Sequence, residues 1–363
     1  MAYEVPYSPG DQNRQQREAI LKTVNFERPD YIPMVFHING ACWQHYPQDT
    51  LQELMVEHPF LFPDFEPTKD KVTPYFSPVQ RKDHPYTDPW GCTWVTAEDG
   101  ITGTVTLHPL EDWVTFETYH PPNPEATDGL VPIDWDEIAK EYTQQRENGE
   151  LIQAALRHGH TFLQLCDIRG YQNVLFDMTD DDPRLRKLIQ MLEEFNLALV
   201  QKYTKLGIEW MSYPEDLGMQ FGPMLSPKQF REYIKPSYQR LMNPALEANC
   251  IIHMHSDGDI RTLADDLVGS GVQVINLQDL VNGIDWIAER YAGKVCIDLD
   301  IDRQKITPKG TPQEVDQLIR EEVEKLGSKD GGLMMIYGLY PGVPLENVKA
   351  LMDAMEKYAG YYS

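Results

Sequence analysis

The stretch SPKQFREYIKPSYQRLMNPALEANCIIHMHSDGD, residues 226–259, decides the fold class. It opens with a capping box, because Ser226 is followed three residues later by Gln229, and Pro227 occupies the first helical position. That pattern predicts the start of a helix, which is expected to run to about residue 247. The stretch is therefore expected to begin with a helix that leads into the apolar run at residues 250–252.

An apolar run at residues 250–252 predicts a short buried strand. The strand ends in His253, His255 and Asp257, and Gly258 marks the turn behind it. In α/β proteins the carboxyl ends of parallel strands open into the ligand site. Imidazole and carboxylate groups in this position therefore indicate a site that binds a metal or moves protons.

The same alternation of helix and strand continues on both sides of this stretch. Strands are expected at 31–38, 161–166, 208–212, 272–276, 294–299 and 333–337, and helices at 16–24, 136–158, 182–206, 285–291, 311–326 and 344–358. Sustained alternation predicts a parallel sheet with helices on its faces. The number of strands, the length of 363 residues and the closing helix favour a (β/α)8 TIM barrel over an open doubly wound sheet.

Residues 41–135 differ in texture, since they are rich in Pro, Trp, Tyr and His. Residues 93–96 and 103–108 are expected to pair as a hairpin across Asp99-Gly100. We interpret 41–135 as an N-terminal elaboration that caps the barrel mouth. The whole chain, residues 1–363, is then expected to form a single domain.

The composition limits the classes of partner. With 32 basic and 57 acidic residues the formal net charge is -25, which disfavours nucleic acid and anionic membranes. No apolar run approaches the ~18 residues of a membrane span, the N-terminus lacks an apolar signal core, and the five cysteines form no CxxC pair. These features predict a cytoplasmic protein. The strands are followed by no GxGxxG or P-loop, which counts against nucleotide binding.

Polar side chains gather at the expected strand ends, where a barrel would bring them together. The acidic and imidazole groups that best suit a zinc ion are His255, Glu215, Asp216 and Asp257. Three protein ligands would leave an open position for a substrate oxygen. The alternative is that Glu215 and Asp216 cap turns, and that Asp257 caps a helix.

Aromatic residues in and before the elaboration suggest a substrate pocket, or equally the core of a small cap. The candidate substrate-binding residues are Phe36, His37, Asn39 and Trp43 near the first strand, and Gln278 near a later one.

Short motifs in this order resemble the uroporphyrinogen decarboxylase superfamily, and within it the corrinoid-dependent methyltransferase branch. The motifs are Arg17-Glu18-Ala19-Ile20, Arg28-Pro29-Asp30-Tyr31-Ile32-Pro33, Ser226-Pro227, His255-Ser256-Asp257-Gly258, Gly310-Thr311-Pro312 and Val343-Pro344-Leu345-Glu346-Asn347. They cover almost the whole chain. The resemblance implies a (β/α)8 barrel with its site at the carboxyl ends of the strands.

Departures from the family pattern favour one kind of member. Decarboxylases carry an Arg-rich motif after the first strand, whereas residues 37–43 contain no Arg. Thiol-methylating members hold Cys where this chain has Asp257, and a second Cys at or near Tyr337. An oxygen-rich site suits an ether oxygen better than a thiolate. The chain thus resembles the aryl methyl ether O-demethylases, which transfer methyl from a methoxylated aromatic compound to the cobalt of a separate corrinoid protein.

This resemblance implies Zn2+, a corrinoid (cobalamin) carried by a partner protein, and His255, Asp257 and Tyr337 as catalytic residues. Methylcobamide-dependent methyl transfer to a small thiol and a metal-free decarboxylase-like lyase are the alternatives, followed by a non-enzymatic scaffold. The oligomeric state is open, and a homodimer is among the arrangements that the sequence allows.

Overall fold

The computed structural model describes residues 9–363, with side chains from Gln12 onward. The described chain divides into two compact units. The first unit comprises the residues up to Lys22, Asp88–Cys92 and His108–Asn276, and the second unit comprises Thr23–Thr87, Thr93–Leu107 and Leu277–Ser363. The expected single domain over 1–363 stays a prediction.

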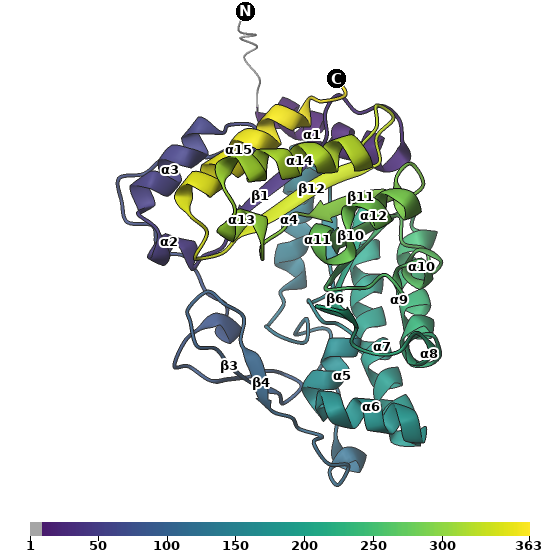
Figure 1. Ribbon diagram of the computed structural model, residues 1–363. Helices are drawn as coiled ribbons and strands as arrows, with labels where there is room; N and C mark the ends of the chain where they lie inside the picture. Colours follow the sequence, from purple (N-terminus) through teal and green to yellow (C-terminus); the bar gives the residue numbers. More distant parts are fainter. Residues whose placement is uncertain (1–8) are drawn as a thin grey trace, which may run out of the picture. The chain divides into compact units, whose positions relative to one another are not determined.

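The first unit contains three parallel strands, β5 (Gln153–Ala155), β6 (Trp210–Asp216) and β9 (Ile251–Asp257), hydrogen bonded in the order β5-β6-β9. Its helices are α4 (Trp135–Glu147), α5 (Phe162–Arg169), α6 (Tyr171–Asp180), α7 (Pro183–Lys205), α8 (Pro227–Gln229), the π-helical η3 (Phe230–Ile234), α9 (Lys235–Glu247) and α10 (Ala264–Val268), with the 3-10 helix η2 (Phe116–Thr118). A two-stranded hairpin, β7 (Gly218–Met219) and β8 (Gly222–Pro223), follows β6. Helices α7 and α9 pack against each other in this unit (Figure 1).

The second unit has the parallel order β1 (Met34–Ile38), β12 (Leu333–Leu339), β11 (Cys296–Asp300). Its helices are α2 (Cys42–His45), α3 (Gln48–Glu57), α11 (Asp279–Asn282), α12 (Ile284–Tyr291), α13 (Ile306–Lys309), α14 (Pro312–Leu326) and α15 (Leu345–Ala359), with the 3-10 helix η1 (Pro78–Gln80). A separate antiparallel sheet joins β2 (Tyr86–Thr87), β3 (Thr93–Val95) and β4 (Thr104–Leu107). The expected hairpin across Asp99-Gly100 is therefore confirmed as β3 and β4.

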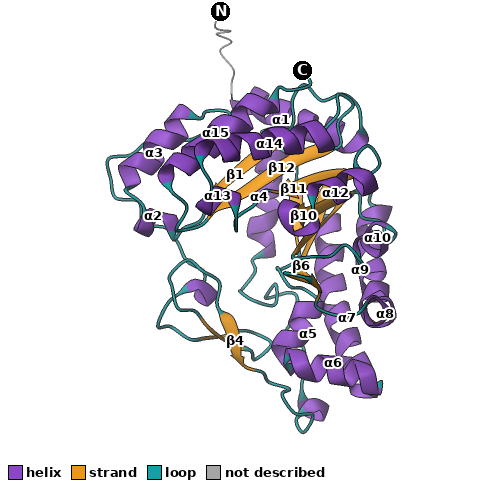
Figure 2. Ribbon diagram, viewed as in Figure 1, coloured by secondary structure: helices purple, strands orange, loops and turns teal. Residues whose placement is uncertain are grey.

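Two elements contain residues of both units: α1 (Pro9–Asn25) and β10 (Val274–Gln278). The complete hydrogen-bonded order of the main sheet is β1-β12-β11-β10-β9-β6-β5, and Figure 2 colours its strands orange. The α/β class is thereby confirmed. Within residues 9–363 this sheet has seven strands, with β1 and β5 at the two ends of the order, where a closed (β/α)8 barrel would have eight.

The strand expected at residues 161–166 is wrong, because these residues belong to helix α5. A short apolar run does not by itself distinguish a strand from a buried helix. Both Phe162 and Leu165 are fully buried. The run therefore lacks the alternation of apolar and polar residues that would distinguish a strand from a helix. The N-terminus of α5 is capped by a side chain from β6, far away in the sequence, which no local pattern could indicate.

The expected helix at 136–158 was also too long. Helix α4 ends at Glu147, and Gln153–Ala155 form strand β5 instead. Gly149 lies just beyond the end of α4 with φ +77°, a conformation that glycine adopts readily and that ends the helix. Helix α6 had not been predicted.

Local helix signals were reliable. Ser226 accepts a hydrogen bond from the Gln229 backbone N–H, so the expected capping box is confirmed. Thr311 accepts one from the Glu314 backbone N–H and forms a second capping box at the start of the helix expected at 311–326. Asp182 caps α7 in front of Pro183. Within residues 9–363, no helix combines the length and the apolar character that a bilayer span requires.

Candidate functional site

The carboxyl ends of β6 and β9 bring polar side chains together in the first unit. The two strands run in parallel register, with Pro214 opposite His255 and Asp216 opposite Asp257. Alternate residues of a strand point to the same face of a sheet. His255 and Asp257 therefore share a face, and Asp216 joins them on it.

The centre of this cluster is the carboxylate of Asp216. Its Oδ1 lies 3.6 Å from His255 Nε2 and 3.3 Å from His158 Nε2. The two imidazole rings are 5.5 Å apart between centroids and tilted by 49°. His158, Asp216 and His255 each offer one ligand atom, and the three atoms lie within 4.8 Å of one another. We call these three residues the His158–Asp216–His255 cluster.

His158 is the member that the sequence did not indicate. It lies in the loop between β5 and α5, in a region where the sequence predicts the end of a helix. Half of its side chain, 51%, is exposed, whereas His255 is 20% exposed. Because the strand β5 was not recognised, no strand end was expected beside His158.

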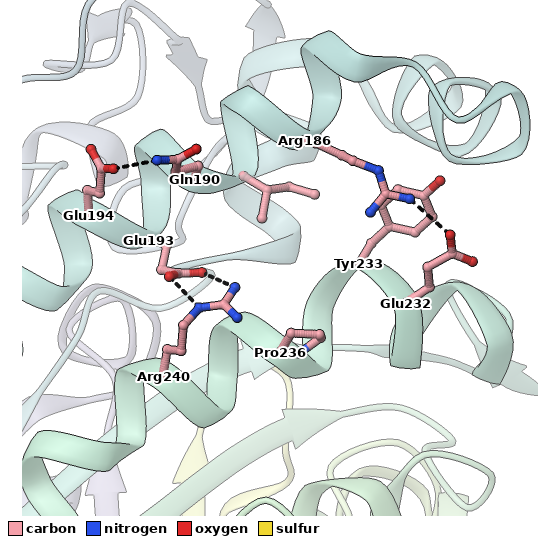
Figure 3. Close-up of a pocket in the computed structure, with 9 residues that line it drawn as sticks. Arg186, Gln190, Glu193, Glu194, Glu232, Tyr233, Pro236 and Arg240 are labelled. Carbon is pink, nitrogen blue, oxygen red and sulfur yellow. Dashed lines mark hydrogen bonds and ion pairs between the residues drawn. The ribbon is translucent and has the colours of Figure 1, made fainter.

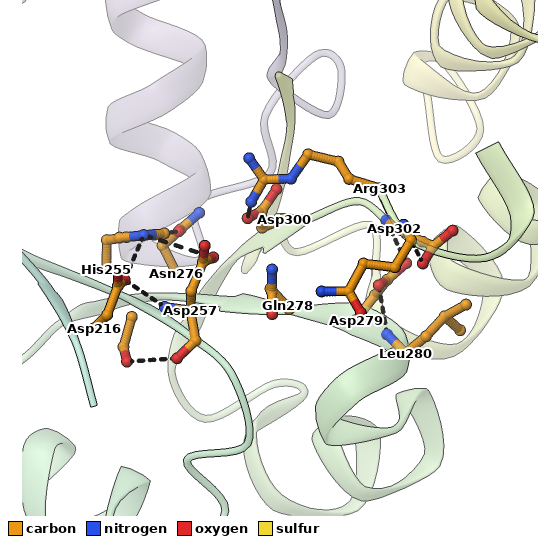
Figure 4. Close-up of polar contacts among 12 residues, drawn as sticks. Asp216, His255, Asp257, Asn276, Gln278, Asp279, Leu280, Asp300, Asp302 and Arg303 are labelled. Carbon is orange, nitrogen blue, oxygen red and sulfur yellow. Dashed lines mark hydrogen bonds and ion pairs between the residues drawn. The ribbon is translucent and has the colours of Figure 1, made fainter. Parts of the chain in front are cut away.

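The imidazole of His255 has a defined orientation. Its Nδ1 is hydrogen bonded to the side-chain oxygen of Asn276, as Figure 4 shows with a dashed line. Since an amide oxygen can only accept, Nδ1 must donate. The other nitrogen, Nε2, faces Asp216 and lies 3.8 Å from Asp257 Oδ1. This arrangement presents Nε2 as the ligand atom, in the manner of metal-binding histidines whose other nitrogen donates to an oxygen.

The charges in the cluster depend on one another. Burial alone would lower the pKa of His255, but the hydrogen bond to Asp216, the charge of Asp257 and the hydrogen bond to Asn276 outweigh it and raise the pKa to about 9. Burial alone would raise the pKa of Asp216, but hydrogen bonds from His158 and His255 hold the pKa well below its ordinary value. Without a metal, the cluster therefore holds an imidazolium against a carboxylate.

The donor spacing fits a zinc ion. Ligand atoms that surround one zinc tetrahedrally at about 2.0–2.2 Å lie about 3.3–3.6 Å from one another. The distances from Asp216 Oδ1 to the two Nε2 atoms are 3.3 Å and 3.6 Å. Two imidazoles and one carboxylate are also a donor set found in catalytic zinc sites. The residues present thus fit a divalent metal, with His158, Asp216 and His255 as its ligands.

Asp257 lies at the rim of the cluster. Its backbone N–H donates to Asp216 Oδ1 at 3.1 Å, and its side chain is 39% exposed. Behind it, Gly258 has φ +80° and touches Gly218 so closely that a Cβ on Gly258 would lie 2.2 Å from the Gly218 carbonyl carbon. This backbone contact holds the ends of β6 and β9 together just beyond the two acids.

Glu215, expected as a metal ligand, points to the opposite face of β6. Its carboxylate is fully buried and accepts hydrogen bonds from the backbone N–H groups of Thr161, Phe162 and Leu163 at 2.9–3.1 Å. The Tyr238 hydroxyl donates to it at 2.7 Å. Burial raises the pKa of Glu215 against these hydrogen bonds. The structure therefore places Glu215 at the N-terminus of α5 rather than in the cluster.

The other residues selected from the sequence belong to the second unit. Tyr337 is fully buried, its hydroxyl donates to Thr307 Oγ1 at 3.1 Å, and its ring lies 5.3 Å from that of Phe36. Burial raises the pKa of Tyr337. Phe36 is buried as well, so the two rings form part of the core of this unit. The catalytic role of Tyr337 stays a prediction.

His37, Asn39, Trp43 and Gln278 complete that group. Asn39 links two backbone segments, since its side chain accepts from Ala41 N at 2.8 Å and donates to Gly100 O at 3.2 Å. His37 is exposed on β1, Trp43 is half-buried in α2, and Gln278 is buried at the end of β10. Their role in substrate binding stays a prediction.

The second unit also holds a buried group of carboxylates, part of which is visible in Figure 4. Asp279 Oδ2 accepts from the backbone N–H of Asp302 at 2.9 Å, and Asp302 in turn accepts from the N–H groups that open α13. Glu322 on α14 is fully buried near the carboxyl group of Asp279, and among the described residues no hydrogen-bond donor reaches either of its carboxylate oxygens. Burial, and then Asp279, raises the pKa of Glu322. The raised pKa favours a neutral, protonated Glu322 beside the Asp279 carboxyl group.

A groove of about 450 Å³ lies between α7 and the η3–α9 segment of the first unit (Figure 3). Its charged groups are already paired. Arg240 holds Glu193 through two hydrogen bonds of 2.5 and 2.6 Å, and Arg186 binds Glu232 at 2.9 Å. Since these ion pairs satisfy one another, the groove is a weaker candidate for chemistry than the His158–Asp216–His255 cluster.

Comparisons with known proteins identify the family of the chain. The family model described as uroporphyrinogen decarboxylase (URO-D) matches residues 158–358, more than half of the chain. The matched segment includes all three residues of the cluster. A curated uroporphyrinogen decarboxylase from Christiangramia forsetii is 23% identical over 177 residues, which cover 47% of this chain and 48% of the relative. The chain thus matches about half the length of that relative.

Among solved structures, a methyltransferase from Methanosarcina mazei superposes with a TM-score of 0.65 at 17% sequence identity. The alignment covers 96% of this chain and 99% of that protein. At this identity the likeness shows a shared fold. The family match over residues 158–358 shows that the chain belongs to the uroporphyrinogen decarboxylase (URO-D) family.

Proposed function

We propose that this protein is a methyltransferase that moves a methyl group from a methoxylated aromatic compound to the cobalt of a corrinoid carried by a separate protein. The observation that carries the proposal is that Asp216 Oδ1 lies 3.3 Å from His158 Nε2 and 3.6 Å from His255 Nε2, a spacing that suits one metal ion. The fold shared with a methyltransferase supports the reaction class. The proposal includes a (β/α)8-type arrangement with the site at the strand carboxyl ends.

The donor atoms support an ether oxygen rather than a thiol as the activated group. All five cysteines are buried, and the groups with metal-ligand spacing in the described residues contain no cysteine. Nitrogen and oxygen donors make a harder site than thiolates do. A methyl ether offers a neutral oxygen whose departure as phenolate needs assistance.

His158, Asp216 and His255 would hold a zinc ion, and Asn276 fixes the ring of His255 so that Nε2 faces the site. When bound, zinc supplies a Lewis acid that polarises the ether oxygen. As the methyl carbon–oxygen bond breaks, the methyl group passes to the acceptor and the electron pair stays on oxygen. We assign to Asp257, whose side chain is 39% exposed at the rim, the transfer of a proton from solvent to the phenolate oxygen.

The test is a methyl-transfer assay with the zinc-loaded protein, a reduced corrinoid protein and a panel of methoxybenzenes. We expect methylated corrinoid and one equivalent of the phenol, and a loss of both products in Asp216→Asn. The absence of transfer across the panel from a protein that contains zinc would contradict the proposed reaction.

A second candidate is a metal-free lyase of the decarboxylase type, which the family description and the curated relative favour. It predicts turnover of a carboxylated substrate that survives complete removal of metal by a chelator. Against it, residues 37–43 offer no arginine for a substrate with many carboxylates.

A further inference from the structure

The loop that carries His158, residues 156–161, is fastened to strand β6 along its backbone. Leu156 N donates to Ser212 O at 3.1 Å, and Gly159 N donates to Pro214 O at 2.9 Å. These two bonds hold the loop on either side of His158. The loop thus follows the strand that ends in Asp216, the carboxylate that His158 contacts.

Arg157 holds the same loop through its side chain. Its guanidinium is almost fully buried, at 5% exposure, and its Nη2 lies 3.0 Å from Asp167 Oδ2. Nη1 donates to the side-chain oxygen of Gln164, and Nε donates to the backbone oxygen of His158 at 3.1 Å. The guanidinium therefore connects helix α5, which carries Asp167 and Gln164, to the backbone of His158 itself.

Helix α5 is in turn fixed to β6 by Glu215, which accepts hydrogen bonds from its first backbone N–H groups. These contacts form a closed ring. It runs from Glu215 on β6 to α5, through Asp167 to Arg157, then to His158, and returns to β6 at Asp216. A ring of contacts that begins and ends on one strand restricts the position of each member.

We infer that Arg157 is a positioning residue for the metal ligand His158. The inference rests on the metal centre of the proposed function, and goes beyond it by assigning a residue outside the ligand set. Three donors of one planar guanidinium are used, on a carboxylate, an amide and a carbonyl. Lysine has no such planar fork of donors, so it cannot replace Arg157 in all three contacts.

A double-mutant cycle tests this assignment, with Co2+ as the probe because its absorption spectrum reports the ligand set. We expect Arg157→Lys to weaken Co2+ binding by about 10–100-fold, the range for residues that orient metal ligands. In a His158→Ala background, the same substitution should change the affinity by less than a factor of about two. Arg146→Lys is the matched control, since Arg146 also donates to backbone carbonyls, those of Leu206 and Gly207, and should leave Co2+ binding unchanged.

An equal loss of Co2+ affinity in the wild-type and His158→Ala backgrounds would show that Arg157 acts on the fold in general. No loss of affinity in either background would show that Arg157 does not position His158. Each of these results overturns the inference. If Arg157→Lys does not fold, Asp167→Asn loosens the same guanidinium and should show the same dependence on His158. A wild-type protein that binds no Co2+ would remove the metal centre and the inference together. A cycle with the expected coupling supports the inference even if no methyl transfer is observed.

Discussion

His255 donates its Nδ1 proton to the side-chain oxygen of Asn276, and this hydrogen bond turns Nε2 towards Asp216. The pair spans β9 and β10. The sequence predicts His255 as a metal ligand, whereas Asn276 is only the last residue of the strand expected at 272–276. Their contact converts His255 from one of two histidines on a strand into a ligand of defined orientation. His253, two residues earlier, is hydrogen bonded instead to Ser212 at 2.6 Å.

Replacement of Asn276 should weaken the metal centre without removing it. Asn276→Ala leaves Nδ1 of His255 without its acceptor, so we expect zinc affinity to fall by about 10–100-fold. Asn276→Asp keeps an acceptor in place and should retain most of the affinity. Competition titrations against a chromophoric chelator measure both variants, and an unchanged affinity in Asn276→Ala would remove the orienting role from this residue.

Removal of His158 should have a larger effect. His158→Ala deletes one of three ligands, and we expect zinc affinity to fall by more than about 100-fold, beyond the range for orienting residues. Because half of this side chain is exposed, the thermal unfolding temperature of the metal-free protein should change little. His120→Ala, which removes an exposed histidine of the same unit, is the control. Equal affinities in the two variants would show that His158 is not a ligand.

Much of this site could be predicted from the sequence, because its signals were local. The apolar run before His255 and the turn at Asp257-Gly258 identified a strand end, and the structure confirms it in β9. Asp216 was selected in the same way. The capping box at Ser226 identified a helix start correctly, since its hydrogen bonds join residues only three positions apart.

The remainder depended on distant contacts. Whether Glu215 or Asp216 faces the site follows from the register of β6 with β9, because adjacent residues point to opposite faces. The sequence does not display that register. His158 was missed because the short strand β5 has only three residues, too few to show a period. Helix α5 was mistaken for a strand because its cap, Glu215, comes from another element.

The contact between Gly218 and Gly258 should be intolerant of any side chain. A Cβ on Gly218 would lie 2.5 Å from the Gly258 carbonyl carbon, and one on Gly258 would also require a residue with φ +80°. We expect Gly258→Ala to separate the ends of β6 and β9, with a loss of metal binding and a destabilisation of about 1–3 kcal/mol. Urea unfolding and metal titration measure the two effects.

Gly222→Ala is the control for this experiment. Gly222 lies in the same β7–β8 hairpin and has a positive φ of +146°, but no other atom lies within 4 Å of its Cβ position. Its substitution adds backbone strain without a clash, so metal binding should persist. If Gly222→Ala and Gly258→Ala lose metal alike, strain and not the glycine contact is responsible.

The buried pair of Glu322 and Asp279 predicts a pH dependence of stability in the second unit. Burial and Asp279 raise the pKa of Glu322 in the folded protein. The stabilising contribution of this group is therefore complete below the pKa of a glutamate in the unfolded chain, about 4.3. This contribution is lost as the pH rises through the higher pKa that Glu322 has in the folded protein. Above the unfolded pKa, the unfolded chain releases the proton freely, whereas the folded protein must keep it or bury a second negative charge.

Glu322→Gln removes the requirement for a proton. The variant should gain stability relative to the wild type as the pH rises from 5 to 8, and its unfolding free energy should vary less with pH. Urea unfolding at the two pH values measures this difference. A constant difference between variant and wild type over this range would show that the pKa of Glu322 is not raised in the folded protein.

The most direct test of the central claim is a crystal structure of the zinc-loaded protein with anomalous diffraction recorded on both sides of the zinc edge. The account predicts one anomalous peak bound by His158 Nε2, Asp216 and His255 Nε2, with Asn276 still hydrogen bonded to His255 Nδ1 and Glu215 still at the N-terminus of α5. A peak elsewhere, or a zinc ion bound by Glu215 in place of His158, would contradict it.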